Sequence, residues 1–206
     1  IRRMMGFDRP LIVQYGDWLW SALHGDLGES FITGASVGPA VAERLPATLS
    51  LAVAALIIAL TIALPAGVIS ALRPGSLIDY VAMLFSQIGV SLPDFWLGIL
   101  LILVFSLGLG WLPPSGYASP LEDFGDWLRH LVLPATTIGL ITASILTRFI
   151  RSAVLEVLHQ NYVRTARAKG LPERRVINRH VMLNAAIPIV TIVGLQMASL
   201  LGGVII

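Results

Sequence analysis

The sequence contains no cysteine, a single lysine and few charged residues, which make up 13% of its 206 positions. The absence of cysteine excludes disulfide bonds and thiolate metal sites. The four histidines, His24, His130, His159 and His180, are too far apart in sequence to indicate a local cluster of ligands. The sequence therefore predicts no metal site and no cofactor bound by this chain.

The single lysine also excludes a common nucleotide-binding motif. In the phosphate-binding loop G-x-x-x-x-G-K-[ST], the lysine reaches the nucleotide phosphates and is followed by serine or threonine. Here Lys169 is followed by Gly170. A match to the serine-hydrolase pattern G-x-S-x-G at residues 34–38 lies in a polar loop, without the strand and helix that this motif requires. We therefore expect no enzyme, and any ATP hydrolysis that drives this protein is expected on another chain.

Apolar residues dominate what is present, with 56% hydrophobic residues and a mean hydropathy of +0.82. A bilayer core about 30 Å thick needs roughly 20 residues of apolar helix. Four runs of that kind occur, and because spans in lipid with open loops between them must be helical, they predict an all-α polytopic membrane protein. The expected spans are residues 46–72, 80–111, 133–158 and 182–206.

The third run keeps its helical periodicity past Arg148 and Arg151. This pattern predicts a long helix, from Pro134 to about His159, that leaves the membrane and continues into water. The chain begins without methionine and ends inside an apolar run. We therefore expect it to be a fragment of a longer membrane protein.

The positions of the basic residues predict the orientation, because cytoplasmic loops carry an excess of Lys and Arg. Residues 148–180 hold eight basic residues against Glu156 and Glu173, whereas residues 1–44 and the loop at 113–133 hold more acidic than basic residues. We therefore expect residues 148–180 in the cytoplasm, and residues 1–45 as an extracytoplasmic region.

Two outer pieces combine tryptophan with leucine at roughly helical spacing, "LIVQYGDWLWSAL" and "LEDFGDWLRHLVL". Such amphipathic segments are predicted to lie flat among the lipid headgroups, with their tryptophans as anchors. The alternative is that they pack on the outer ends of the spans.

Small residues recur at every fourth position in three of the runs, and such stripes let helices approach closely in lipid. They predict a helix bundle with partners beyond this chain, although stripes of this kind say nothing about a substrate. The stripes are Ala55, Ala59, Ala63 and Gly67; Ala135, Gly139, Ala143 and Thr147; and Gly194, Ala198 and Gly202.

Asp94 is the single acidic residue of the second run. A carboxylate at membrane depth is costly, so it should face a bundle interior or a wet cavity. Asp94 is therefore a candidate for lining a translocation path, and so are Thr137 and Ser144 on the polar face of the third span. The alternative is that Asp94 lies near an interface, or caps a helix that restarts after a kink at Pro93.

The loop from about 159 to 180 contains "NYVRTARAKGLPERRV", the most positively charged stretch of the chain. We expect a short helix there, ended by Gly170 and Pro172. One edge of that helix would be apolar, through Tyr162, Ala166 and Leu171. The other edge would be charged, through Arg164, Arg167 and Lys169.

The stretch "YVRTARAKGLPERRVINRHVMLNAAIPIVTIVGLQMASLLGG" resembles the inner-membrane permease subunits of binding-protein-dependent ABC importers, in the dipeptide, oligopeptide and nickel branch. "LPATLSLAVAALIIAL", "GVSLPDFWLGILLI" and "LGWLPPSGY" support the resemblance. The family's loop pattern starts E-A-A and reaches a glycine after three further residues. Here Arg164 and Thr165 replace the first two positions, while Ala166 and Gly170 are retained. These substitutions are similar to those of the peptide branch.

The resemblance implies a type I ABC importer transmembrane bundle over residues 46–206, with four of about six spans in this fragment. It implies a subunit that forms the translocation path for peptides, or for a related small solute such as nickel, across a bacterial or archaeal plasma membrane. The implied partners are a second homologous permease subunit, two cytoplasmic ABC ATPase subunits, an extracytoplasmic solute-binding protein and membrane lipid. No nucleic-acid partner is expected, because a short basic loop between spans is first a sign of orientation.

By the same resemblance, the loop at 159–180 would form a coupling helix that docks on an ATPase subunit. The residues that the resemblance assigns to docking are Tyr162, Arg164, Thr165, Ala166, Arg167, Lys169, Gly170 and Leu171. The alternative function is a stand-alone secondary transporter or channel. That class would show coupling acids in several spans and inverted repeats, whereas this sequence shows Asp94 alone and no convincing repeat.

Overall fold

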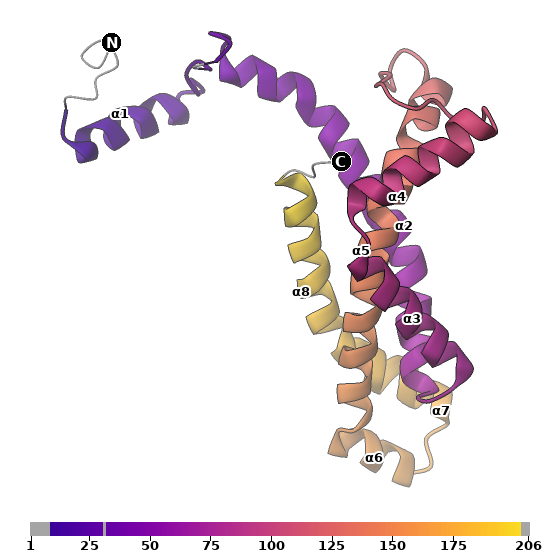
Figure 1. Cartoon of the computed structure of the whole chain (residues 1–206). Coiled ribbons are helices and arrows are strands. Elements are labelled where there is room, and N and C mark those ends of the chain that lie inside the picture. The colour runs from indigo at the N-terminus through magenta and orange to yellow at the C-terminus, as the bar shows by residue number, and fades with distance from the viewer. Residues whose placement is uncertain (1–8, 31, 203–206) are drawn as a thin grey trace. The chain divides into compact units, whose positions relative to one another are not determined.

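The computed structural model describes residues 9–30 and 32–202, and within these ranges it is helical, with one isolated bridge between Glu29 and Ser36 (Figure 1). The predicted all-α class is therefore confirmed. The start of the expected region 1–45 and the end of the expected span 182–206 lie outside the described residues. Contacts divide the chain into a first unit that ends at Thr48 and a second that begins at Leu49.

The first unit contains helix α1, Leu11–Leu23, which follows Pro10 and covers the first amphipathic piece. None of its residues is buried, and Trp18 and Trp20 are 56% and 68% exposed. An ion pair of 2.9 Å between Arg9 and Asp17 spans its first turns. The expected amphipathic helix therefore forms, and its place among lipid headgroups stays a prediction.

Helix α2, Val37–Leu72, continues from the first unit into the second, which holds the remaining elements. Within the described residues, three continuous apolar helices are long enough to cross a membrane: α2, α5 and the joined stretch Glu173–Leu201. A bent pair of helices makes a fourth candidate. The elements after α2 are α3 Leu77–Ser91, α4 Asp94–Leu101, the π-helix η1 Ile102–Gly108, α5 Phe124–Leu158, α6 Asn161–Ala168, α7 Glu173–Arg175, the π-helix η2 Val176–Val181, and α8 Met182–Leu201.

Helix α5 begins earlier than its apolar run predicts. It starts at Phe124 and runs through Pro134, so it includes all but the first three residues of the second amphipathic piece, which the sequence placed in a separate segment. The Asp123 side chain caps this start by accepting a 3.0 Å hydrogen bond from the backbone N–H of Asp126. The expected start at Pro134 was therefore wrong, whereas the end at Leu158, before His159, agrees with the prediction.

The second expected span is broken at Pro93, and its two halves turn by 102°. Leu92 and Pro93 are extended, because proline lacks an N–H and disfavours helical geometry in the residue before it. Asp94 is the first residue of α4 and is half-buried. Its carboxylate lies where a helix dipole favours negative charge. This position agrees with the alternative that a helix restarts after Pro93.

The core of the second unit surrounds α5, on which α3, α4 and α8 pack (Figure 1). Helix α2 reaches α5 through its predicted small stripe: Ala55, Ala59 and Ala63 are fully buried. A Cβ added at Gly67 would lie 2.8 Å from the Ile150 side chain. Close approach through the stripes of α2 and α5 is thus confirmed. In α8, by contrast, Gly194 and Ala198 are exposed.

The contact between α3 and α5 is equally close. A Cβ added at Gly89 of α3 would overlap the side chain of Ser144 in α5. The Ser86 hydroxyl donates a 2.6 Å hydrogen bond to the backbone carbonyl of Ser144. Small side chains on both helices therefore bring the two backbones together.

This contact predicts a large cost for a single methyl group at Gly89. Gly89→Ala should destabilise the folded protein by about 1–3 kcal/mol, because the added Cβ must displace Ser144. Gly194→Ala is the matched control, since no atom of residues 9–30 or 32–202 lies within 4 Å of the position that its Cβ would occupy. Thermal unfolding of the complete protein in detergent measures both. Equal melting temperatures for the two variants would contradict the packing described here.

Candidate functional site

Helix α6 is a short helix that follows directly from the end of α5 (Figure 1). Its inner face packs into the core of the second unit: Val163 is fully buried and Ala166 is 6% exposed. The same cluster contains Val154 from α5 and Val176 and Val181 from η2, all fully buried. The inner face therefore fixes α6 to the end of α5 and to the start of the last long helix.

A glycine ends α6 in a defined way. Gly170 has φ +75°, a left-handed conformation that side chains rarely adopt. The Gly170 N–H donates to the Arg167 carbonyl at 2.9 Å, and the Leu171 N–H donates to the Ala166 carbonyl at 3.4 Å. These two bonds form a Schellman motif, so the predicted helix and its predicted end are both present.

Five of the predicted docking residues are exposed on α6 and its C-cap, and we call them the outer face: Tyr162, Arg164, Thr165, Arg167 and Lys169. Asn161 and Ala168 of α6 are exposed as well. Within this face, Arg167 is paired: its Nε and Nη2 donate to Glu173 at 3.1 and 2.6 Å. These hydrogen bonds raise the pKa of Arg167. The pair also spans the Gly170 turn, so it stabilises the connection from α6 to α7.

The structure separates the eight predicted docking residues by exposure. The five of the outer face and Gly170 are exposed, whereas Leu171 is half-buried and Ala166 faces this chain's own core. Ala166 thus does not belong to an exposed apolar edge, because a helix anchored through Val163 must also turn Ala166, three residues later, inward. Docking through the exposed residues stays a prediction.

The three candidates for path lining lie apart. Asp94 begins α4, while Thr137 and Ser144 are buried in α5, at 1% and 0% exposure. The Thr137 hydroxyl donates to the Leu133 carbonyl at 2.9 Å, and the Ser144 hydroxyl donates to the Ile141 carbonyl at 2.6 Å. Burial and bonds to their own helix give Thr137 and Ser144 a packing role in this chain. A role in path lining stays a prediction.

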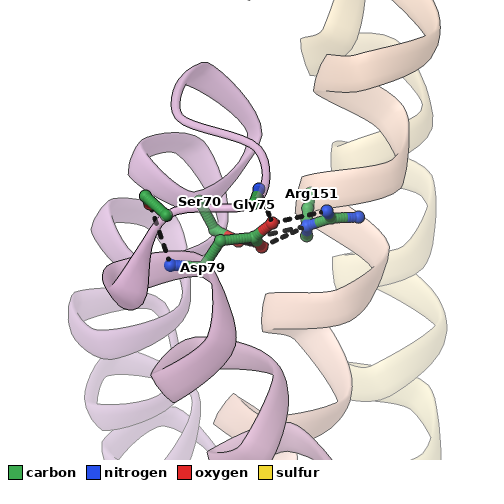
Figure 2. A network of polar contacts seen from close by, with 5 residues as sticks. Ser70, Gly75, Asp79 and Arg151 are labelled. Carbon is green, nitrogen blue, oxygen red and sulfur yellow. Dashed lines mark hydrogen bonds and ion pairs between the residues drawn. The ribbon is translucent and has the colours of Figure 1, made fainter.

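Near the α6 end of α5, Arg151 forms an ion pair with Asp79 of α3, in which the carboxylate is buried and the guanidinium is half-buried (Figure 2). Its Nε donates to Asp79 Oδ1 at 2.6 Å and its Nη2 donates to Oδ2 at 2.8 Å, so the contact is bidentate. The Asp79 side chain is 8% exposed and that of Arg151 is 23% exposed. The Ser70 hydroxyl of α2 and the Gly75 N–H also donate to this carboxylate, the latter at 2.9 Å.

Sequence reasoning missed this network, although one signal was present. "SLID", residues 76–79, fits the capping pattern [ST]-x-x-[DE]. The Ser76 hydroxyl does cap α3, since it accepts a 3.3 Å hydrogen bond from the Asp79 N–H. The pattern predicts the start of the helix. It does not predict that the Asp79 carboxylate turns toward Arg151, 72 residues later.

The Gly170 turn predicts which substitutions α6 tolerates. Gly170→Val should destabilise the turn by about 1–2 kcal/mol, because a β-branched residue is strained at positive φ. Gly170→Asn should be tolerated better, since asparagine adopts this conformation more readily. Hydrogen exchange of the α6 amides in the complete protein measures the difference. Equal exchange rates in the two variants would argue against the role of the turn.

Comparison with known proteins assigns the family. Residues 63–206 match the family model described as "binding-protein-dependent transport system inner membrane component". The chain is 43% identical to a di/tripeptide transport system permease protein of Pseudomonas aeruginosa, over 98% of this chain and 66% of that protein. It is also 43% identical to an oligopeptide transport system permease protein of Bacillus subtilis, over 98% of this chain and 65% of that protein.

The chain thus spans about two thirds of the length of these relatives. The family match covers the last ten residues of α2 and every element after it, including α6 and the Asp79–Arg151 pair. Together with its long apolar helices, this match means that the chain is a multi-pass membrane protein and belongs to the family of inner-membrane permease components of binding-protein-dependent transport systems.

Proposed function

We propose that this chain is part of the permease subunit of an ATP-driven peptide importer, and that the outer face of α6 docks on a cytoplasmic ATPase subunit. The observation that carries the proposal is the construction of α6 itself. Its inner face is buried against α5 and η2, while its outer face presents a tyrosine, a threonine and three basic residues. A short helix held on one side and exposed on the other is suited to transmit a movement.

In this proposal, the long helix α5 transmits movement of α6 into the membrane-spanning part of the bundle. It runs without interruption from Phe124 to Leu158, and the buried cluster around Val154 connects its last turns to α6. In the proposed cycle, ATP binding closes two ATPase subunits and draws the docked α6 helices together. The α5 helices then tilt, and access to the path switches from one side of the membrane to the other.

The proposed substrate class comes from the relatives. Two permeases at 43% identity are named for di/tripeptide and oligopeptide transport. We propose peptides on that ground, while transport of nickel stays a prediction from the resemblance alone. The proposed setting is a bacterial plasma membrane, with a second permease subunit, two ATPase subunits and an extracytoplasmic binding protein as partners. The described residues offer no observation that favours a stand-alone transporter or channel.

A charge reversal on α6 tests the docking. In the complete permease, Arg164→Glu should lower co-purification of the ATPase subunits and uptake of labelled trialanine into reconstituted vesicles. The expected loss is about tenfold, because an exposed interfacial cation becomes repulsive toward the surface that it faces.

Glu122→Arg is the matched control, since it reverses one exposed charge in the loop between η1 and α5. We expect it to leave both measurements unchanged. If Arg164→Glu assembles and transports as well as Glu122→Arg, the proposed docking face is wrong.

A further inference from the structure

We propose that Asp79 and Arg151 are positioning residues that join α3 to α5, so that a displacement of α6 moves the α2–α3 hairpin together with α5. The proposal rests on the function proposed above, because it concerns how movement of α6 spreads through the bundle. Four facts about the pair support it: its burial, its place along α5, the contacts around it and the surface that it crosses.

The burial of the Asp79 carboxylate and the partial burial of Arg151 do not by themselves explain why an ion pair is present. Removing two charges from water costs several kcal/mol, and a well-packed apolar pair of similar size is often as stable. What an ion pair adds is geometry. A bidentate contact between a guanidinium and a carboxylate is directional, so it resists both sliding and rotation of the two helices.

The composition of the α3–α5 interface explains why resistance to sliding of these two helices matters. Around Gly89, Ser86 and Ser144 the α3–α5 interface is made of small side chains, which offer few obstacles to sliding. Asp79 pairs with Arg151, and Ser86 pairs with the backbone of Ser144. The two contacts are seven residues apart on each antiparallel helix, about two turns. They therefore fix the register of α3 on α5 at two points.

The pair also brings α2 into the same body. The Ser70 hydroxyl of α2 bonds to the Asp79 carboxylate and accepts a 3.1 Å hydrogen bond from Arg151 Nε. The Gly75 N–H, in the turn between α2 and α3, bonds to the same carboxylate. One guanidinium thus contacts α2 and α3 together (Figure 2).

We call the Asp79–Arg151 pair the joint. The position of Arg151 on α5 places it between α6 and the α2–α3 hairpin along the path by which a displacement of α6 would spread. Arg151 lies about two turns before the end of α5. Beyond it on α5, Val154 packs in a fully buried cluster with Val163 of α6 and Val176 of η2. A displacement that enters at α6 therefore passes through packed side chains to Arg151, and from there to the hairpin. Because α3 ends at the bend before α4, the hairpin would carry that bend with it.

A distance measurement in the assembled complex tests the joint. Spin labels at Leu84→Cys on α3 and Ser152→Cys on α5, both exposed positions, give one distance across the joint. This chain contains no native cysteine that would compete for the label. We expect the distance to stay the same in the nucleotide-free and ATP-bound complexes. A change of more than about 2 Å in this label-to-label distance, the size of an ordinary shift between packed helices, would overturn the proposal. It would mean that the Asp79–Arg151 contact breaks when ATP binds.

A double variant adds a functional measurement. Asp79→Leu with Arg151→Met removes both charges, so neither is left buried and unpaired. We expect the ATPase subunits to stay bound, but the distance to shift on ATP binding and uptake of trialanine per ATP hydrolysed to fall at least fivefold. Arg148→Met, at an exposed arginine one turn earlier, is the matched control and should behave as the unaltered complex.

The outcomes separate the two proposals. A double variant with unaltered distance and unaltered uptake per ATP would overturn the joint while ATP-driven transport stands. An unaltered complex that binds no ATPase subunit would overturn the proposed function, and the joint with it. A merely structural pair would lower the yield of assembled complex and leave uptake per ATP unchanged, which also counts against the joint.

Discussion

The close approach of α5 to its neighbours is the constraint on which the rest of the second unit depends. Alanine, glycine and serine occupy the contacts, so that a methyl group at Gly67 or Gly89 would meet a side chain of α5. In lipid, where apolar side chains gain little by leaving their surroundings, such close packing is the main attraction between helices. It holds α2 and α3 against α5, but surfaces of small residues fix register poorly. Directional contacts must do so.

Directional polar contacts fix the relative positions of the helices in two places. Within the bundle, the bidentate pair of Asp79 and Arg151 links three helical segments through one carboxylate. At the end of α5, the Gly170 turn and the Arg167–Glu173 pair orient α6 relative to the last long helix. Both groups of contacts lie close to the same end of α5. A displacement of α6 would therefore act first on these directional contacts. The small-residue interfaces between α5 and its neighbours lie farther from α6.

The sequence predicted what depends on composition and local pattern. Long apolar runs gave the helices, small stripes gave the close faces of α2 and α5, and Gly170 with Pro172 gave the end of α6. It did not predict features that depend on contacts between distant residues. Nothing local distinguishes Asp79 from an ordinary capping residue, or Ala166 from an exposed one. The bend at Pro93 was expected, but its size of 102° depends on how α4 packs against α5.

The exposed small-residue stripe of α8 can be compared with the buried stripes of α2 and α5. In α8 the stripe that includes Gly194 and Ala198 is exposed, and Leu195 beside it is 61% exposed. On α2 and α5, stripes of the same composition are buried against each other. A small-residue stripe on an apolar helix is suited to close contact with another helix. Among the described residues, α5 already carries α2, α3, α4 and α8 around it, and no atom lies within 4 Å of a Cβ added at Gly194, so contact between the α8 stripe and a further helix stays a prediction.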